Sequence, residues 1–273
     1  MVNISLLFLW LSAFIFTTGV ASTMVAARGT SELKQLRQRH KGASFITSMD
    51  FEHKLRICNA YPYRFPMEVY LGQERLSQQP LAYKACQEYV KKLKEGDKLD
   101  FRVGDSSAGT FSVSELPEND AVLLLVIYRH DAHSTAVAFE SHIFSNLVNS
   151  QIAVLDAYRG NAKATPRIRD VSDAKTDRNE ELRYDSVVAV NQGHYEVVLQ
   201  GADGETKATH ELVALNRDSY VVVRIGLEVE DGESYPQDLL VYPQSDPRIL
   251  MGAASLPHSL MAAVAIAILA YFP

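Results

Sequence analysis

A tandem repeat within the chain limits what it can fold into. One copy runs from Leu81 to Val103, and the other runs from Leu182 to Leu199. Both contain Leu-x-Tyr, a short strand-like run, a glycine, and a stretch in which polar and apolar residues alternate. Alternation with a period of two is typical of a β-strand, because successive side chains face opposite sides of a sheet. The repeat therefore predicts one all-β module used twice.

Each copy is followed by a long apolar strand, residues 121–128 after the first and 219–227 after the second. A Gly/Asp hairpin turn precedes each of these strands. The long strand is apolar on both faces, so we expect it at the centre of a sheet that is covered on both sides. The sequence predicts an all-β fold of two tandem antiparallel β-sandwich domains, residues 51–148 and 149–245. The short, partly apolar connection between them favours packed domains over a flexible string.

The second unit departs from the first in one place. Where the first has an alternating strand at Met67–Leu71, the second has a polar, charged stretch at 161–179. We expect a looser, mobile insertion there in place of the strand.

Charge argues against one class of partner. The chain of 273 residues has a formal net charge of −6. A nucleic-acid binder needs a basic face that displaces counterions from phosphates. We expect no nucleic-acid partner.

The N-terminus is typical of an export signal. Residues 4–20 are nearly all apolar, and Gly19-Val20-Ala21 offers the small residues that signal peptidase reads. We interpret residues 1–21 as a signal peptide. Residues 22–50 then form a basic lead-in that we expect to be disordered, with a membrane-surface segment as the alternative.

The C-terminal segment, residues 246–273, is typical of a lipid-anchor signal. Small residues begin at Gly252, a short spacer follows, and an apolar tail runs from Leu260 to Phe272. That tail is shorter than the ~20 residues that a membrane-spanning helix needs. We expect a glycosylphosphatidylinositol anchor near Gly252 and a protein that is either lipid-anchored at the extracellular face of the plasma membrane or secreted. A weak membrane span and a helix packed on the second domain are the alternatives.

Several short patterns of the first unit carry a resemblance. They are Asn59-Ala60-Tyr61-Pro62, the strand Glu68-Val69-Tyr70-Leu71, Leu81-Ala82-Tyr83, and the glycine strand that follows. The chain resembles a family of secreted β-sandwich repeats of unknown function from microbial surfaces. It is also similar to the bacterial periplasmic accessory protein of alginate O-acetylation. The resemblance implies a surface module or a non-catalytic partner in polysaccharide modification, and it supplies no catalytic residue. A lipid-anchor tail is foreign to the bacterial accessory protein.

Cys58 and Cys86 are the two cysteines of the chain. Their counterparts in the second unit are Leu155 and Val187, so we expect both cysteines to face inward. An exported chain oxidises such a pair, and we predict a disulfide. Two buried free thiols are the alternative.

The loop that contains Pro62 and Pro66 in the first unit is the candidate binding site. Its residues are Tyr61, Tyr63, Arg64 and Phe65. Aromatic rings could stack on the faces of sugars, or they could cap the end of the sandwich core. The second unit keeps only Tyr158 in the corresponding loop, so we assign any such site to the first unit.

Other constellations favour neither metal binding nor catalysis. His130, Asp131 and His133, together with His142, are residue types that bind zinc. The first three fall in an expected hairpin loop, where histidines are usually solvated. Gly104-Asp105-Ser106 is similar to a serine-esterase nucleophile motif, but no His base with an orienting Asp follows it. We expect no metal, no cofactor and no enzymatic activity.

These observations predict a non-enzymatic binding or scaffold protein at the cell surface. Its expected partner is an extracellular polysaccharide or a surface protein, with contact to the membrane through the anchor. An accessory factor for polysaccharide O-acetylation is the alternative, and a serine esterase is disfavoured.

Overall fold

The computed structural model describes residues 51–145, 148–171, 179–230 and 232–251. The predicted signal peptide, the basic lead-in and the anchor position Gly252 lie outside these residues. A short helix, α2 (Arg248–Met251), follows the last strand. No helix within the described ranges is long and apolar enough to cross a membrane.

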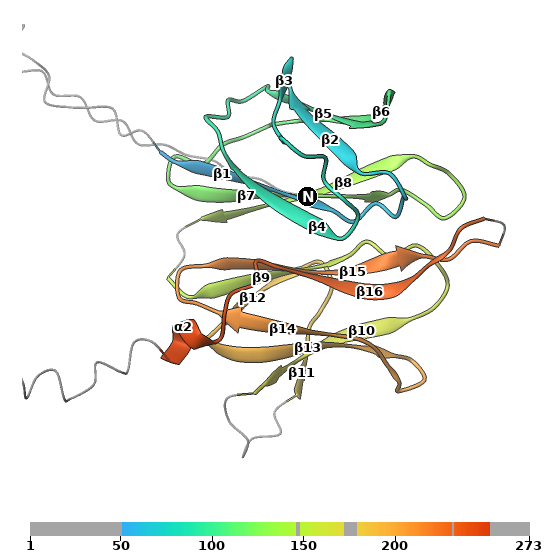
Figure 1. The fold of residues 1–273 in the computed structure, drawn as a ribbon. Helices are drawn as coiled ribbons and strands as arrows, with labels where there is room; N and C mark the ends of the chain where they lie inside the picture. Colours follow the sequence, from blue (N-terminus) through green and yellow to red (C-terminus); the bar gives the residue numbers. More distant parts are fainter. Residues whose placement is uncertain (1–50, 146–147, 172–178, 231, 252–273) are drawn as a thin grey trace, which may run out of the picture. The chain divides into compact units, whose positions relative to one another are not determined.

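The described strands form two sandwiches of two sheets each, which we name A to D (Figure 1). In the order of their pairing, the strands of sheet A are β4 (Ala85–Val90), β1 (His53–Asn59), β7 (Ala121–Arg129) and β8 (Val137–Ser145). Those of sheet B are β3 (Glu74–Arg75), β2 (Met67–Leu71), β5 (Lys98–Val103) and β6 (Ser106–Ser112). Those of sheet C are β12 (Ser186–Val190), β9 (Ser150–Asp156), β15 (Ser219–Leu227) and β16 (Tyr235–Tyr242). Those of sheet D are β11 (Asn179–Glu181), β10 (Ala164–Asp170), β13 (Gly193–Gly201) and β14 (Thr206–Ala214).

The two sandwiches have the same topology, which confirms the predicted all-β fold of two repeated modules. The first combines sheets A and B, and the second combines sheets C and D. One pairing in each differs from the antiparallel expectation: β1 runs parallel to β7, and β9 runs parallel to β15. Both long apolar strands are central, as predicted, and β15 is buried along its whole length.

Apolar side chains at alternate positions of the strands form the core of each sandwich. On β5, Leu99 and Phe101 are fully buried, whereas Asp100 and Arg102 face outward. They pack with residues of sheet A, which include Leu55 and Ile57. The second sandwich has a matching core, with Val197 and Leu199 of β13 against Ile152 and Val154 of β9. Burial of these apolar faces supplies most of the driving force for folding.

The prediction of a looser insertion at 161–179 was wrong for its first half. Residues 164–170 form the strand β10, which pairs with β13 along its length. Ala164, Pro166 and Ile168 are buried on alternate positions, while Arg167 and Arg169 point away from the core. The charged residues on the outer face concealed the alternation in the sequence. Residues 172–178 lie outside the described part.

The sandwiches also share a core of their own, so the expectation of packed domains is confirmed. Sheet A and sheet C meet through side chains on the outer faces of β1, β7, β9 and β15. Cys58, Leu124 and Val126 of the first sandwich are buried with Leu155 and Val223 of the second. β1 therefore buries Ile57 in its own sandwich and Cys58 against the other one.

The contact between the sandwiches has an approximate two-fold character. β4 of the first lies beside β16 of the second, where Cys86 and Tyr242 line one groove. On the other flank, Glu140 of β8 and Asp185, which precedes β12, line a second groove. Since β4 corresponds to β12 and β8 corresponds to β16, the internal contact resembles the self-complementary interface of a symmetric dimer.

Candidate functional site

Loops of both sandwiches gather at one end of the molecule. Because β1 is parallel to β7, the loops that follow them, 60–66 and 130–136, leave the same end of the first sandwich. The loop 157–163 and the described residues of the β15–β16 loop, 228–230 and 232–234, share an end of the second for the same reason. The Arg159 guanidinium donates to the His130 carbonyl at 3.0 Å, which brings the two ends together. We call this region the loop end; it lies on the right in Figure 1.

The predicted binding loop is an aromatic ladder that rises from the core. Tyr61 is only 5% exposed and packs in the core of the first sandwich, where its hydroxyl donates to the Thr135 carbonyl at 2.8 Å. Tyr63 is partly buried, with its ring centroid 6.1 Å from that of Tyr61. Phe65 is 50% exposed, and its centroid lies 5.8 Å from Tyr63. The exposed Arg64 stacks over Phe65 at 4.7 Å.

Each of the two interpretations of this loop, a cap on the core or an exposed binding surface, therefore fits different residues. Tyr61 caps the core, while Phe65 and Arg64 present their side chains to solvent. The structure brings all the predicted site residues together. Whether they bind a ligand stays a prediction.

Local hydrogen bonds hold the ladder in place. The Asn59 side chain donates to the Leu81 carbonyl at 2.9 Å and accepts from the Tyr61 amide at 3.0 Å. At the other end of the loop, Met67 and Leu81 exchange backbone hydrogen bonds. Pro62 and Pro66 fix their own φ angles between these anchors. Both ends of the loop are therefore held in place before any ligand binds.

The neighbouring β7–β8 loop supports the ladder. The Arg129 guanidinium stacks over the Tyr61 ring at 5.3 Å and donates to the Ser134 carbonyl at 3.1 Å. Asp131 accepts from the amides of His133 and Ser134 and from the Ser134 hydroxyl. These hydrogen bonds, together with His130, hold the pKa of Asp131 well below its usual range. The carboxylate thus closes the loop.

Within the described ranges, no cluster of His, Cys, Asp or Glu is arranged to hold a metal ion. The Gly104-Asp105-Ser106 stretch turns the chain between β5 and β6, with Gly104 at a φ of 58°. Glycine adopts that left-handed conformation at little cost.

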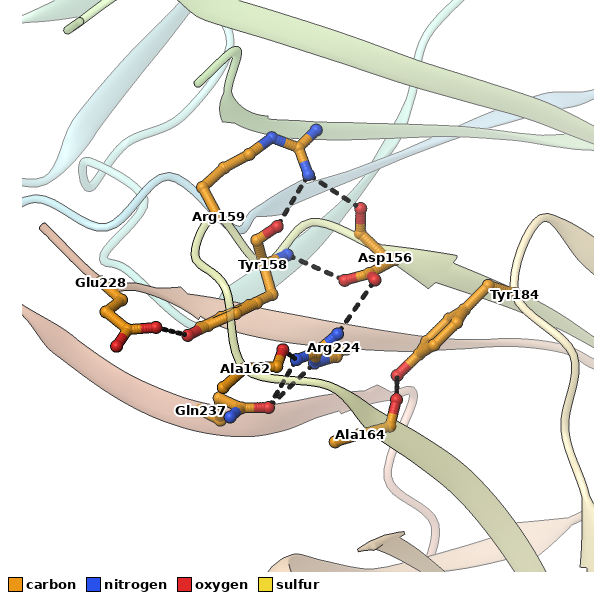
Figure 2. Close-up of polar contacts among 9 residues, drawn as sticks. All are labelled: Asp156, Tyr158, Arg159, Ala162, Ala164, Tyr184, Arg224, Glu228 and Gln237. Atoms are coloured by element: carbon orange, nitrogen blue, oxygen red, sulfur yellow. Dashed lines mark hydrogen bonds and ion pairs between the residues drawn. The ribbon is translucent and has the colours of Figure 1, made fainter. Parts of the chain in front are cut away.

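The second sandwich carries a buried arginine, Arg224, where the first sandwich has Ile127 (Figure 2). Arg224 is 5% exposed, and it lies opposite Asp156 in the β9–β15 register. Its guanidinium lies 3.1 Å from the Asp156 carboxylate and donates to the Gln237 side chain at 2.6 Å and to the Ala162 carbonyl at 2.5 Å. It also stacks over the Tyr158 ring at 4.2 Å. The charge is therefore fully engaged by the protein.

This cluster fastens the β9–β10 loop to the core. Besides the Ala162 carbonyl on Arg224, the Tyr158 hydroxyl donates to Glu228 at 2.8 Å. Burial and that carboxylate raise the pKa of Tyr158 to about 12. Burial likewise raises the pKa of Tyr184, whose hydroxyl donates to the Ala164 carbonyl at 3.0 Å. The cluster is structural, and it presents no exposed ring comparable to Phe65.

The predicted disulfide is present: Cys58 and Cys86 are bonded and lie directly opposite each other on β1 and β4. The expectation that both cysteines face the core of the first sandwich was wrong: Cys58 is fully buried between the two sandwiches, and Cys86 is only partly buried there. The comparison with Val187 was wrong, since Val187 is 43% exposed. β12 pairs Val187 with Ala153 and not with Leu155, so the two repeats differ in register there.

Sequence reasoning missed three residues of the loop end: Tyr83, Arg129 and Tyr235. The Tyr83 and Tyr235 rings, from different sandwiches, lie edge to face with centroids 5.5 Å apart. Tyr83 belongs to the Leu-x-Tyr pattern that both units share, so the sequence does not single it out. Its contact with Tyr235 depends on how the sandwiches pack.

Comparisons with known proteins show no family for this chain. No family model matches it. No curated protein matches it either. A solved structure described as "Alpha-glucan binding by a streptococcal virulence factor" is 13% identical, over 67% of this chain and 96% of that one, with a TM-score of 0.22. A TM-score this low does not establish a common fold.

Proposed function

We propose that this chain is a non-catalytic binding protein of the cell surface or the secreted space, and that it holds an extracellular polysaccharide at the loop end. One observation carries the proposal: Phe65 and Arg64 are exposed at the top of a ladder whose lowest rung, Tyr61, is buried. The expected location rests on the export and anchor signals in the sequence.

The chemistry of the ladder suits a sugar. The apolar C–H face of a pyranose ring packs against an aromatic ring, and the hydroxyls around the ring accept hydrogen bonds from a guanidinium. Both groups are supplied by neighbouring residues, Phe65 and Arg64. Because the loop is held by Asn59 and by the Met67–Leu81 pair, little conformational entropy is lost when a ligand binds.

The second sandwich offers a contrast that favours this assignment. There the equivalent loop is tied down through Ala162 and Arg224, and Tyr158 is 7% exposed. Loops that vary while the strands persist are where function concentrates. We therefore assign the polysaccharide contact to the loop of the first sandwich.

The test is binding to a panel of immobilised polysaccharides. Phe65→Ala and Arg64→Ala should each weaken the best interaction by about fivefold, because each removes a direct contact of order 1 kcal/mol. The matched control is Val187→Ala, an apolar residue of similar exposure on the second sandwich, which should leave binding unchanged. Equal binding by all variants would contradict the site. Release of acetate or of reducing ends from the bound polysaccharide would contradict a non-catalytic role.

A further inference from the structure

The loop end contains buried hydrogen-bonding groups that the protein itself does not use. Among the described residues, the Tyr83 hydroxyl, the Tyr235 hydroxyl and the Arg129 Nε are shielded from solvent and have no hydrogen-bond partner. Such groups are rare in folded proteins, because each one forgoes its hydrogen bonds to water without replacement. Three of them in one region call for a specific explanation.

These groups lie in one neighbourhood. Tyr83 and Tyr235 pack edge to face, with centroids 5.5 Å apart, and Arg129 stacks on Tyr61 at the base of the ladder. Burial and the nearby Glu233 carboxylate, which does not meet hydrogen-bond geometry with the hydroxyl, raise the pKa of Tyr235, and the charges of Arg129 and Arg64 oppose that rise. Arg129 ends β7, Tyr235 begins β16 and Tyr83 lies just before β4, so all three groups are at the loop end.

We infer that the binding site is composite: one sugar ring stacks on the Phe65 ladder of the first sandwich, and once the side chains that shield them move aside, the hydroxyls of Tyr83 and Tyr235 and the Arg129 Nε hydrogen-bond to it, so that both sandwiches contact it. The inference rests on the proposed function and extends it to the second sandwich.

The donor set indicates an uncharged sugar. A tyrosine hydroxyl both donates and accepts, and the Arg129 Nε donates, so together they match the hydroxyl groups of a neutral ring. The two arginines alone would attract a carboxylate. However, the β15–β16 loop brings Glu228, Glu230 and Glu233 to the same end, and these repel an anion. A neutral, hydroxyl-rich ring fits both observations.

The decisive variants change the second sandwich alone. Tyr235→Phe keeps the ring and removes the hydroxyl, and it should weaken binding of the best neutral oligosaccharide by about threefold to tenfold, the value of one hydrogen bond. Tyr235→Ala should weaken it further. Tyr195→Phe, which removes a tyrosine hydroxyl from β13 at the other end of the same sandwich, is the control and should bind as the wild type does.

Affinities are measured by calorimetry on the full mature chain, with neutral and uronic-acid oligosaccharides as probes. If Phe65→Ala weakens binding and both Tyr235 variants do not, the composite site is overturned while the proposed function stands. If Phe65→Ala has no effect either, the proposed function fails as well. Tighter binding of the uronic-acid probes than of the neutral ones would overturn the assignment to an uncharged sugar. If Tyr235→Ala fails to fold, Tyr235→Phe alone decides.

Discussion

The rings of Tyr83 and Tyr235 meet edge to face across the junction of two separate sandwiches, with centroids 5.5 Å apart, and neither hydroxyl has a hydrogen-bond partner among the described residues. Burial, with Asp238 and Tyr235 nearby, raises the pKa of Tyr83. The hydroxyl is thus neutral and desolvated in the unliganded protein. A buried hydroxyl without a partner lowers the stability of the folded protein. Its presence here therefore suggests a role other than stability.

Tyr83→Phe should therefore stabilise the unliganded protein. Removing an unsatisfied buried hydroxyl while keeping the ring should raise the free energy of unfolding by about 1–3 kcal/mol. Urea denaturation without saccharide measures this. Tyr89→Phe is the control: its hydroxyl donates to Gln87 at 3.0 Å, so its loss should be neutral or destabilising. A Tyr83→Phe variant that is no more stable than the wild type would show that this hydroxyl is already satisfied, by solvent.

The Cys58–Cys86 disulfide should contribute on the order of 3 kcal/mol, since the bond closes a loop with a sequence separation of 28. Both single alanine variants lose this contribution. Cys58→Ala should cost more than Cys86→Ala, because Cys58 is fully buried between the sandwiches and Cys86 is partly exposed. Thermal denaturation under non-reducing conditions compares them. Two free thiols titrated in the unfolded, oxidised wild type would rule out the bond.

The contribution of the buried Arg224 to stability can be tested by replacing it with isoleucine, the residue at the equivalent position, Ile127, of the first sandwich. In the register of the first sandwich, Asn59 lies opposite Ile127 where the second has Asp156 opposite Arg224. Arg224→Ile alone leaves the Asp156 carboxylate without its ion-pair partner and should cost about 3–5 kcal/mol.

The double variant Asp156→Asn, Arg224→Ile restores the pair found in the first sandwich and should recover part of that loss. Denaturant midpoints of the two single variants and the double variant give the coupling energy. If the two changes are additive, Asp156 and Arg224 do not depend on each other in the way the contacts imply.

The ion pair between Lys84 and Asp238 should make the junction of the sandwiches sensitive to acid. Burial raises the pKa of Asp238, but hydrogen bonds from Lys84, the Leu239 amide and His210 lower it by more, so the folded pKa lies below the usual value. A depressed carboxyl pKa contributes stability that is present above the unfolded pKa and is lost as the pH falls through the folded pKa.

The free energies of unfolding of the wild type and of Asp238→Asn should therefore differ by about 1 kcal/mol near pH 7. The difference should shrink below about pH 4, where even an unperturbed aspartate begins to protonate. A difference that stays constant or grows as the pH falls would contradict the assigned role of Asp238.

Much of the fold could be predicted because the strands repeat. The alternation at Leu99 and Phe101 and the apolar run at 219–227 are local signals, and they led to the correct architecture. β10 was missed because Arg167 and Arg169 occupy its solvent face, so its polar character concealed the alternation of Ala164, Pro166 and Ile168. The parallel pairs in sheets A and C join strands distant in the sequence, and no local pattern encodes them.

The candidate site could be predicted only in part. The aromatic spacing of Tyr61, Tyr63 and Phe65 is visible in the sequence, but which ring is buried depends on the core that forms beneath them. Tyr235 joins this region only because sheets A and C pack face to face. The role of Arg224 likewise depends on its register with Asp156. These relations are long-range, and a single sequence does not display them.

The most direct test of the account is a hydrogen–deuterium exchange footprint of the bound oligosaccharide on the full mature chain. We predict that the amides of residues 63–65 and 232–235 gain protection together when the ligand saturates the protein, while the amides of β10 and β13 in sheet D are unchanged. Protection confined to the solvent faces of sheets B and D, with the loop end unaffected, would contradict the account.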